Sequence, residues 1–252
     1  MLSPSEKLES TRSASSVIEV DKFPPLWQRR LRPILDRPPG TLMIHEIYRS
    51  LQGEGTHAGL PCLFVRLTGC HLRCGYCDSP HAFTQGTPWK IEDVITQVLL
   101  HADPLVQVTG GEPLLQDEVY PLMAALADAG KTILLETSGC IDAAKVDPRV
   151  RIIYDVKTPA SGEHEANHWP NFERLKPGDE VKFIVCDHQD FQWSLKIIDQ
   201  FDLTSQVPVL ISPSYGQIDL EQLAQWVLDS RRQLRLQIQL HKILWGAARR
   251  GV

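Results

Sequence analysis

The sequence lacks a long apolar run, a secretory signal and an excess of positive charge. No stretch reaches the roughly 18 apolar residues that a membrane-spanning helix needs, and the N-terminus lacks the apolar run of about 7 to 15 residues that a signal peptide carries. The formal net charge is -5, whereas domains that grip nucleic acid usually carry a basic excess. These absences favour a cytoplasmic protein that acts on a small polar molecule, without direct contact to nucleic acid or to a membrane.

Cysteine is scarce, and half of it lies in one short segment. Three of the six cysteines stand in "GCHLRCGYCDSPH" (69–81) as Cys70, Cys74 and Cys77. In the reducing cytoplasm, cysteines are expected to bind metal or to act in catalysis before they form disulfides. Three thiolates in so short a loop can all reach one metal ion or cluster.

The sequence also lacks a second C-x-x-C pair, which many structural zinc sites contain. A zinc ion would need a fourth ligand, for which His71, His81, Cys62 and Cys140 are candidates. A 4Fe-4S cluster with one open iron fits three cysteines better, because catalytic metal sites keep an open coordination position. The cluster is therefore predicted, and a zinc-stabilised interaction module is the alternative from a different class. Cys62, Cys140 and Cys186 are otherwise expected to be small buried hydrophobic residues.

The first 41 residues differ in composition from the rest of the chain. They are rich in serine and then in proline, and such a stretch can bury little apolar surface. We expect residues 1–41 to be a disordered leader, although "LWQRRLRPIL" (26–35) could instead form a short amphipathic docking segment. Residues 42–252 are expected to form one catalytic domain.

From residue 42 onward, short apolar runs alternate with helical patterns. Nearly continuous apolar runs are typical of parallel strands that are covered on both faces. The predicted strands are residues 62–68, 105–109, 132–137, 151–156, 181–185, 207–212 and 234–240. Stripes of apolar residues with a period of 3.6 predict helices over 91–99, 119–126 and 220–228. Repeated strand–helix units indicate an α/β fold with a parallel sheet, either open or curved into a full or partial barrel.

Polar motifs directly follow five of these predicted strands. They are "TGC" (68–70), "TGGEP" (109–113), "ETSG" (136–139), "DVKTPASG" (155–162) and "SPSYG" (212–216). Chemistry in parallel α/β folds gathers at the carboxyl ends of the strands. Glycine-rich turns simply end many strands, but that does not explain why charged residues stand beside these glycines. The sequence therefore predicts one site at this edge of the sheet.

Two motifs resemble those of the radical S-adenosylmethionine (SAM) superfamily. "CHLRCGYC" resembles its cluster motif, and "TGGEP" resembles its SAM amino-group motif. The resemblance implies a partial (β/α)6 barrel in which Cys70, Cys74 and Cys77 hold a 4Fe-4S cluster and SAM chelates the open iron. It also implies that one-electron cleavage of SAM gives a 5'-deoxyadenosyl radical, which removes a hydrogen atom from the substrate.

A second set of motifs resembles the 7-carboxy-7-deazaguanine synthase family. The motifs are "SLQGEG" (50–55), "FVRLTGC" (64–70), "YCDS" (76–79), "ETSG" and "QLHK" (239–242). The resemblance implies a carbon–nitrogen lyase that converts 6-carboxy-5,6,7,8-tetrahydropterin to 7-carboxy-7-deazaguanine with loss of ammonia, in 7-deazapurine and queuosine biosynthesis. It further implies a need for Mg²⁺, a homodimer and a reductant such as flavodoxin. A glycyl-radical-activating enzyme shares the cysteine spacing, and it is the alternative within the superfamily.

The second resemblance also implies which residues bind the pterin substrate. Arg66 would take the substrate carboxylate, which suits the planar fork of donors on a guanidinium group. The substrate-lining residues implied by the motifs are Leu51, Gln52, Gly53, Arg66, Thr109 and His241.

The SAM and Mg²⁺ sites are implied in the same way. The SAM-lining residues would be Tyr76, Cys77, Asp78, Gly111, Asp155, Val156, Lys157, Ser212, Pro213, Ser214 and Tyr215, and the Mg²⁺ ligand would be Ser79. Glycine at position 111 would let the chain approach the ligand closely. Glu112 could contact SAM or could orient its loop. "DVKTPAS" departs from the S-P-K sequence of the family, and the leader and the closing "GAARRGV" (246–252) have no counterpart in it.

Overall fold

The computed structural model describes residues 24–252, whose nine strands form a single sheet. The strands are β1 (Thr41–Leu51), β2 (Pro61–Leu67), β3 (Thr87–Lys90), β4 (Leu105–Gly110), β5 (Thr132–Thr137), β6 (Arg151–Val156), β7 (Glu180–Val185), β8 (Val209–Pro213) and β9 (Leu234–Leu236). They lie in the order β3-β1-β2-β4-β5-β6-β7-β8-β9. β1 runs antiparallel to β2 and β3, and the other seven strands are parallel. The sheet ends at β3 and β9 without closing, so the barrel is partial.

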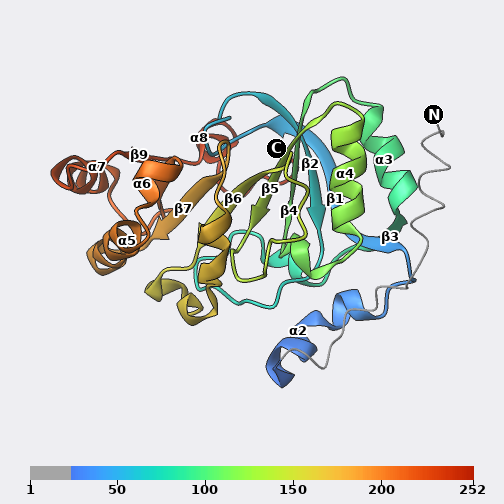
Figure 1. Ribbon diagram of the computed structural model, residues 1–252, viewed down its shortest axis with the longest axis horizontal. Helices are drawn as coiled ribbons and strands as arrows, with labels where there is room; N and C mark the ends of the chain where they lie inside the picture. The colour runs from blue at the N-terminus through green and yellow to red at the C-terminus, as the bar shows by residue number, and fades with distance from the viewer. Residues whose placement is uncertain (1–23) are drawn as a thin grey trace.

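Helices cover the outer face of this sheet (Figure 1). The α-helices are α2 (Pro25–Leu35), α3 (Ile91–Leu99), α4 (Val119–Asp128), α5 (His188–Gln200), α6 (Leu203–Gln206), α7 (Leu220–Asp229) and α8 (Leu240–Trp245). Short 3-10 helices are η2 (Pro80–Phe83), η3 (Pro113–Leu115), η4 (Pro159–Ser161), η5 (His164–Ala166) and η6 (Trp169–Arg174). None of the helices among residues 24–252 has the length and apolar character needed to span a membrane.

The predicted α/β fold with a parallel sheet is confirmed, with differences at its edges. All seven predicted strands and the three predicted helices are present. The last strand is much shorter than predicted, because β9 ends at Leu236 and α8 begins at Leu240. Strands β1 and β3 and helix α5 were not predicted. The two strands are antiparallel, β1 is mostly half-buried and β3 is mostly exposed, so they lack the continuous apolar run that marks a buried parallel strand.

Along each parallel strand, successive side chains point alternately to the outer and the inner face of the sheet, as the pleat requires. In β2, Leu63 and Val65 face outward into the main core against the helices, whereas Cys62 and Phe64 face inward. The inward set forms a smaller apolar cluster with residues of β4, β5 and β6. Toward the carboxyl ends, the inward positions become polar: Arg66, Thr109, Glu136, Asp155, Lys182 and Ser212. The inner face is thus an apolar layer below a polar one.

Helix α2 corrects the prediction of a disordered leader for residues 24–41. Leu31 and Ile34 are fully buried and pack against Leu115 of η3. Ile34 also lies against the loop that follows β2, since a Cβ on Gly69 would come 2.7 Å from its Cγ2. The alternative of an amphipathic docking segment fits this stretch better, because its apolar side is buried in the domain. The part of the predicted leader at residues 1–23 lies outside the described residues.

We predict that Leu31→Ala destabilises the domain. Removal of a fully buried leucine side chain leaves a cavity and costs about 2–5 kcal/mol. The matched control is Leu26→Ala on the same helix, because Leu26 is 55% exposed and surface substitutions change stability by only about 0.5 kcal/mol. Chemical denaturation measures both free energies of unfolding, and equal values for the two variants would show that α2 does not pack as described.

Candidate active site

A cavity of about 740 Å³ opens at the carboxyl ends of the parallel strands. Strands β1, β2, β4, β5, β6, β7 and β8 contribute side chains to it, together with the loops that follow them and the segment from residue 239 to residue 252. The polar layer of the inner face is its floor. The cavity lies at the edge of the sheet where the sequence predicts the site.

The three closely spaced cysteines lie together on this cavity. Cys70, Cys74 and Cys77 all line it, and none of them is in a disulfide. Burial raises the pKa of the Cys70 thiol to about 12 and that of Cys74 to about 11. Thiols in such surroundings stay protonated unless a positive metal centre takes the proton's place. Three thiols that line one cavity fit a 4Fe-4S cluster that would leave one iron open to that cavity.

Two glycines at the end of β4 approach the backbone of β2 and of the cysteine loop (69–81) that follows it. A Cβ on Gly111 would lie 2.2 Å from the carbonyl oxygen of Gly69, and one on Gly110 would lie 2.2 Å from that of Leu67. The amide of Gly111 donates to Leu67 O at 3.1 Å, and that of Glu112 donates to Gly69 O at 2.8 Å. The sequence predicts that Gly111 lets the chain approach a ligand closely. In the structure, the close approach is to the backbone of the cysteine loop.

Glu112 is a fully buried carboxylate that joins two loops of the site. Its oxygens accept hydrogen bonds from the amide of Leu114, the hydroxyl of Thr137, and both the amide and hydroxyl of Ser138, over 2.5 to 3.0 Å. These bonds tie "TGGEP" to "ETSG". A carboxylate with this many donors has little capacity left for a ligand, so of the two expected roles the structure favours the orientation of the loop.

Lys182 is buried in the cavity floor among carboxylates. Its Nζ lies 2.8 Å from Glu54 Oε2 and 3.9 Å from Asp155 Oδ2, and it donates to Glu136 Oε1. Burial alone lowers a lysine pKa, but these carboxylates outweigh it and hold the pKa of Lys182 well above its ordinary value. Burial raises the pKa of the Glu136 carboxyl, but the ammonium group of Lys182 outweighs this effect. The pKa of Glu136 is therefore lowered overall. The pair is therefore ionised inside the cavity.

The cavity also contains polar atoms that the protein leaves without a partner. Asp155 Oδ1 and Ser212 Oγ are buried and have no hydrogen-bond partner among the described residues. Buried polar groups are normally paired. Both residues line the cavity, Asp155 from β6 and Ser212 from β8, so these atoms fit the polar groups of a bound molecule such as SAM.

Arg66 lies on the opposite side of the cavity, where its guanidinium joins three partners. Its Nε donates to Glu46 Oε1 at 2.9 Å, its Nη2 donates to Tyr48 OH at 2.9 Å, and its Nη1 lies 3.4 Å from Ser79 Oγ. These contacts fix a positive charge beside the hydroxyl groups of Tyr48 and Ser79. The arrangement can bind an anionic group of a ligand.

Comparisons with known proteins agree with this geometry. The model of the radical SAM superfamily matches residues 64–154. A 7-carboxy-7-deazaguanine synthase of Chlorobaculum tepidum is 41% identical over 218 residues, which cover 84% of this chain and 97% of that protein. One of Koribacter versatilis is 40% identical over 226 residues, covering 84% of this chain and all of that protein. The chain belongs to the 7-carboxy-7-deazaguanine synthase family.

The fold of a solved structure agrees with this membership. The crystal structure of QueE from Escherichia coli matches with a TM-score of 0.67 and 23% identity, over 80% of this chain and 95% of that chain. At this identity the match concerns the fold alone, which is the partial barrel predicted for the radical SAM superfamily. Membership of that superfamily implies a 4Fe-4S cluster and SAM.

The structure brings nearly all of the predicted site residues to the one cavity. The residues that line it are Leu51, Gln52, Gly53, Arg66, Cys70, Cys74, Tyr76, Cys77, Asp78, Ser79, Thr109, Gly111, Asp155, Lys157, Ser212, Pro213, Ser214, Tyr215 and His241. Val156 is the exception, because strand alternation turns its side chain into the outer core. Only its backbone remains available to a ligand. Gly53 and His241 are in contact, since a Cβ on Gly53 would meet His241 Nδ1 at 2.2 Å.

Several cavity residues were missing from the predicted set. Among them are Glu54, Gln107, Glu136, Lys182, Gln239, Lys242 and the segment 247–252. Two of them carried a usable signal, because Glu136 and Lys182 interrupt apolar strands at positions that alternate with core residues. The contribution of residues 247–252 had no such signal, since only the course of the chain brings them to the cavity.

We predict that Gly111→Ala impairs the retention of the cluster. Its Cβ would collide with the backbone of the cysteine loop, and backbone atoms cannot move aside as a flexible side chain can. Iron content per chain after anaerobic reconstitution and desalting is the measurement, and the variant should retain less iron than the unaltered protein. The matched control is Gly75→Ala in the cysteine loop itself, where the nearest atom would be 3.6 Å away. Equal iron in both variants would rule out the described contact as the constraint.

Proposed function

We propose that this protein converts 6-carboxy-5,6,7,8-tetrahydropterin to 7-carboxy-7-deazaguanine and ammonia, by radical SAM chemistry in 7-deazapurine biosynthesis. The observation that carries the proposal is the meeting of the cysteine loop and a polar, anion-binding wall on one cavity of a chain that belongs to this family. When bound, the cluster and SAM supply hydrogen-atom abstraction. The chain itself binds and orients the reactants and excludes water.

The substrate carboxylate is placed against Arg66 in this proposal. The guanidinium group is fixed by Glu46 and Tyr48, so little conformational freedom is lost when it binds a second carboxylate. Leu51, Gly53 and His241 form the neighbouring wall. A pterin ring fits such a wall because it is flat and carries polar edges.

The polar edge of the pterin is placed against Glu136 and Thr109. Thr109 Oγ1 lies 3.2 Å from Glu136 Oε2, and the carboxylate is held ionised by Lys182. An ionised carboxylate accepts hydrogen bonds from the amino and ring N–H groups of a pterin. Recognition of those donors is thus assigned to Glu136, which stands in the motif "ETSG" but received no role from the motifs.

SAM is placed between the cysteine loop and the ends of β6 and β8. Asp155 and Ser212 offer the buried polar atoms that lack a protein partner, and both stand on the cavity with Tyr76. Mg²⁺ is placed at Ser79, whose hydroxyl lies 3.1 Å from Asp78 Oδ1 and beside Arg66. Hard cations accept hydroxyl and carboxylate oxygens, and the substrate carboxylate would reach the same point.

We also propose an electron donor, a compartment and an oligomeric state for this protein. A reduced flavodoxin is proposed as the electron donor, and the cytoplasm as the compartment, because thiols stay reduced there.

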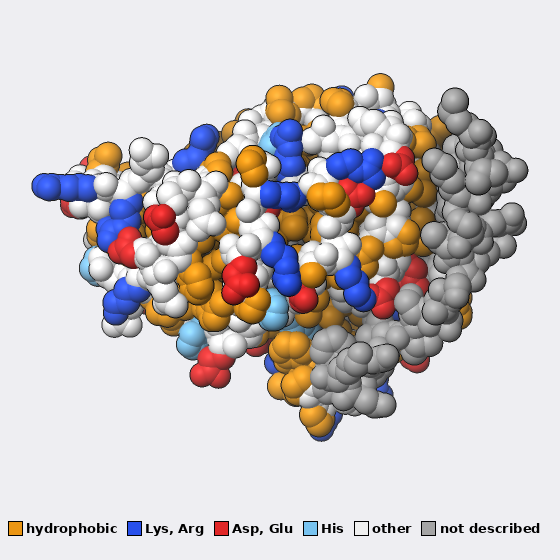
Figure 2. All heavy atoms as spheres, viewed as in Figure 1, with side chains coloured by type: hydrophobic (Ala, Val, Ile, Leu, Met, Phe, Trp, Pro, Cys, Tyr) orange, Lys and Arg blue, Asp and Glu red, His pale blue; other side chains and the backbone are white. Residues whose placement is uncertain are grey.

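On the face drawn in Figure 2, basic and acidic side chains are interspersed rather than gathered by sign. A homodimer is supported by exposed apolar residues in the segment that follows β9, where Ile238 is 39%, Ile243 61% and Leu244 51% exposed.

We predict that the reconstituted protein forms 7-carboxy-7-deazaguanine when SAM, dithionite, Mg²⁺ and 6-carboxytetrahydropterin are added without oxygen. Mass spectrometry detects the product. Cys74→Ala should abolish it because one of the three cluster ligands is lost, whereas Cys62→Ala should retain it because Cys62 is buried in the inner apolar layer.

Two other outcomes of this assay would contradict the proposal. Formation of 5'-deoxyadenosine without the product would keep the radical chemistry but require another substrate, as a glycyl-radical-activating enzyme would. Zinc without iron or sulfide in the purified protein would indicate the zinc-stabilised module instead.

We also predict that Ile243→Glu converts a dimer to a monomer. A charged side chain at a buried apolar interface costs several kcal/mol unless it is paired. Light scattering on the full chain gives the mass, and Leu100→Glu is the control, because Leu100 is 74% exposed beyond α3 and distant in the sheet order from β9. A monomeric mass for the unaltered protein would refute the dimer.

A further inference from the structure

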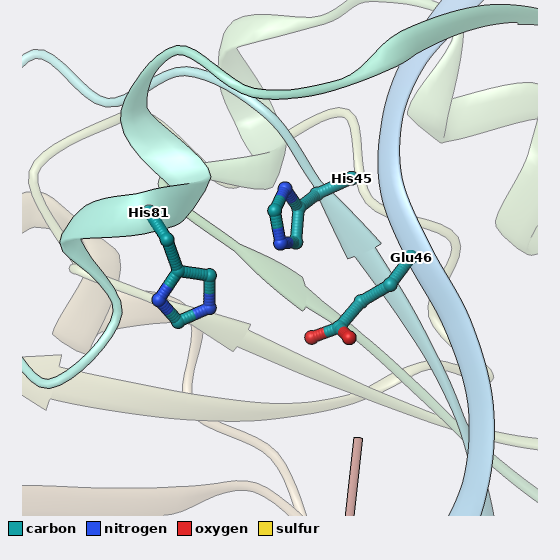
Figure 3. Close-up of side chains that lie close together, drawn as sticks. All are labelled: His45, Glu46 and His81. Carbon is teal, nitrogen blue, oxygen red and sulfur yellow. The ribbon is translucent and has the colours of Figure 1, made fainter. Parts of the chain in front are cut away.

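We propose that His45, Glu46 and His81 form a binding site for one divalent transition-metal ion, separate from the cluster. One potential ligand atom from each residue lies within 4.8 Å of the other two. Figure 3 shows the three side chains pointing toward a common space between β1 and η2. Atoms bound to one ion at about 2.1 Å lie no more than about 4.2 Å apart, so small side-chain rotations would complete the site.

An irregularity in β1 places two consecutive residues on this space. Adjacent side chains of a regular strand point to opposite faces of the sheet. In β1 the register slips, because Ile44 pairs with Leu67 and Glu46 pairs with Arg66, which leaves His45 as an extra residue. A bulge of this kind redirects a side chain. His45 and Glu46 can therefore face one ion together.

A hydrogen bond prepares His45 as a ligand. Its Nδ1 lies 2.8 Å from the carbonyl oxygen of Gln85, which can only accept. Nδ1 must then carry the proton, and the lone pair of Nε2 is left for a metal. Metal-binding histidines commonly have such a bond to a backbone carbonyl, which fixes the tautomer and the orientation of the ring. The His81 ring lies close by, with its centroid 4.9 Å from that of His45.

Glu46 supplies the negative charge of the site and connects it to the cavity. Its Oε1 accepts from Arg66 Nε at 2.9 Å, and Oε2 takes no part in that bond. The nearby guanidinium weakens cation binding, while the carboxylate and two neutral imidazoles favour it. Glu46 and His81 both line the 740 Å³ cavity, so the open coordination positions of the ion would face that cavity.

The donor set indicates the class of metal. Two imidazole nitrogens and one carboxylate oxygen suit Zn²⁺, Fe²⁺, Co²⁺ and Mn²⁺, whereas Mg²⁺ prefers oxygen ligands only. Three protein ligands leave at least one position for water or an anion, as in an open site rather than a closed structural one. The site therefore differs in chemistry from the Mg²⁺ site proposed at Ser79.

Zinc binding to the full chain with its cluster reconstituted tests this site. After anaerobic equilibrium dialysis against a series of Zn²⁺ concentrations with millimolar Mg²⁺ present, elemental analysis should find one zinc per chain. His45→Ala and His81→Ala should each weaken zinc binding about tenfold or more, since effects of this size follow even from loss of an outer partner. His101→Ala is the matched histidine control, because His101 lies in the turn beyond α3, and it should bind zinc as the unaltered protein does.

Two outcomes would overturn the proposal. One is that the unaltered protein binds no zinc. The other is that both histidine variants bind it with unchanged affinity, which would assign the zinc to free cysteines or to another surface. Ser79→Ala distinguishes the two metal sites, since it should leave zinc binding intact. Equal melting temperatures of the variants without zinc would confirm that the losses do not come from unfolding, and iron content would confirm that the cluster is present in each.

Discussion

The close contact between the loops that follow β2 and β4 is the constraint on which the site depends. Two glycines let the backbone of "TGGEP" approach the end of β2 at Leu67 and the cysteine loop at Gly69, where any Cβ would collide. The backbone hydrogen bonds from Gly111 and Glu112 then fix the loop's first residues. Glu112 extends the connection to β5 through its buried carboxylate. The three thiols are thus positioned by a rigid edge of the sheet, although they lie on a loop.

The cysteine loop is supported from its other side by helix α2. The ring of Trp27 lies 4.2 Å from the ring of His71, and Arg30 Nη1 donates to the carbonyl of His71 at 2.6 Å. Arg30 also pairs with Glu163, which accepts from the amide of Arg73 in the same loop. A helix from outside the predicted catalytic domain therefore shields the loop and satisfies its backbone groups.

The inner face of the sheet combines stability with binding because its two layers differ in chemistry. The apolar layer excludes water from the region below the site. The electrostatic interactions among the charged groups above it are therefore stronger than they would be in water. Lys182 is tolerated there because several carboxylates surround it, and a buried charge without a partner would be strongly destabilising. The ionised groups that face the cavity are therefore fixed by the fold before any ligand arrives.

The sequence by itself determined the parallel strands, the edge at which the cavity lies and the family motifs, and it predicted the cysteine ligands of a cluster, because these are encoded by local runs and short spacings. The tertiary structure alone decided which other side chains reach the cavity and which segments support it. Strand alternation brought Lys182 into the site and turned Val156 away from it, and a bulge in β1 aligned His45 with Glu46. Helix α2 was only the alternative to a disordered leader, because prolines and polar residues predict disorder until a partner surface buries Leu31 and Ile34. Packing between segments distant in the sequence has no local signal, so only the folded chain could reveal it.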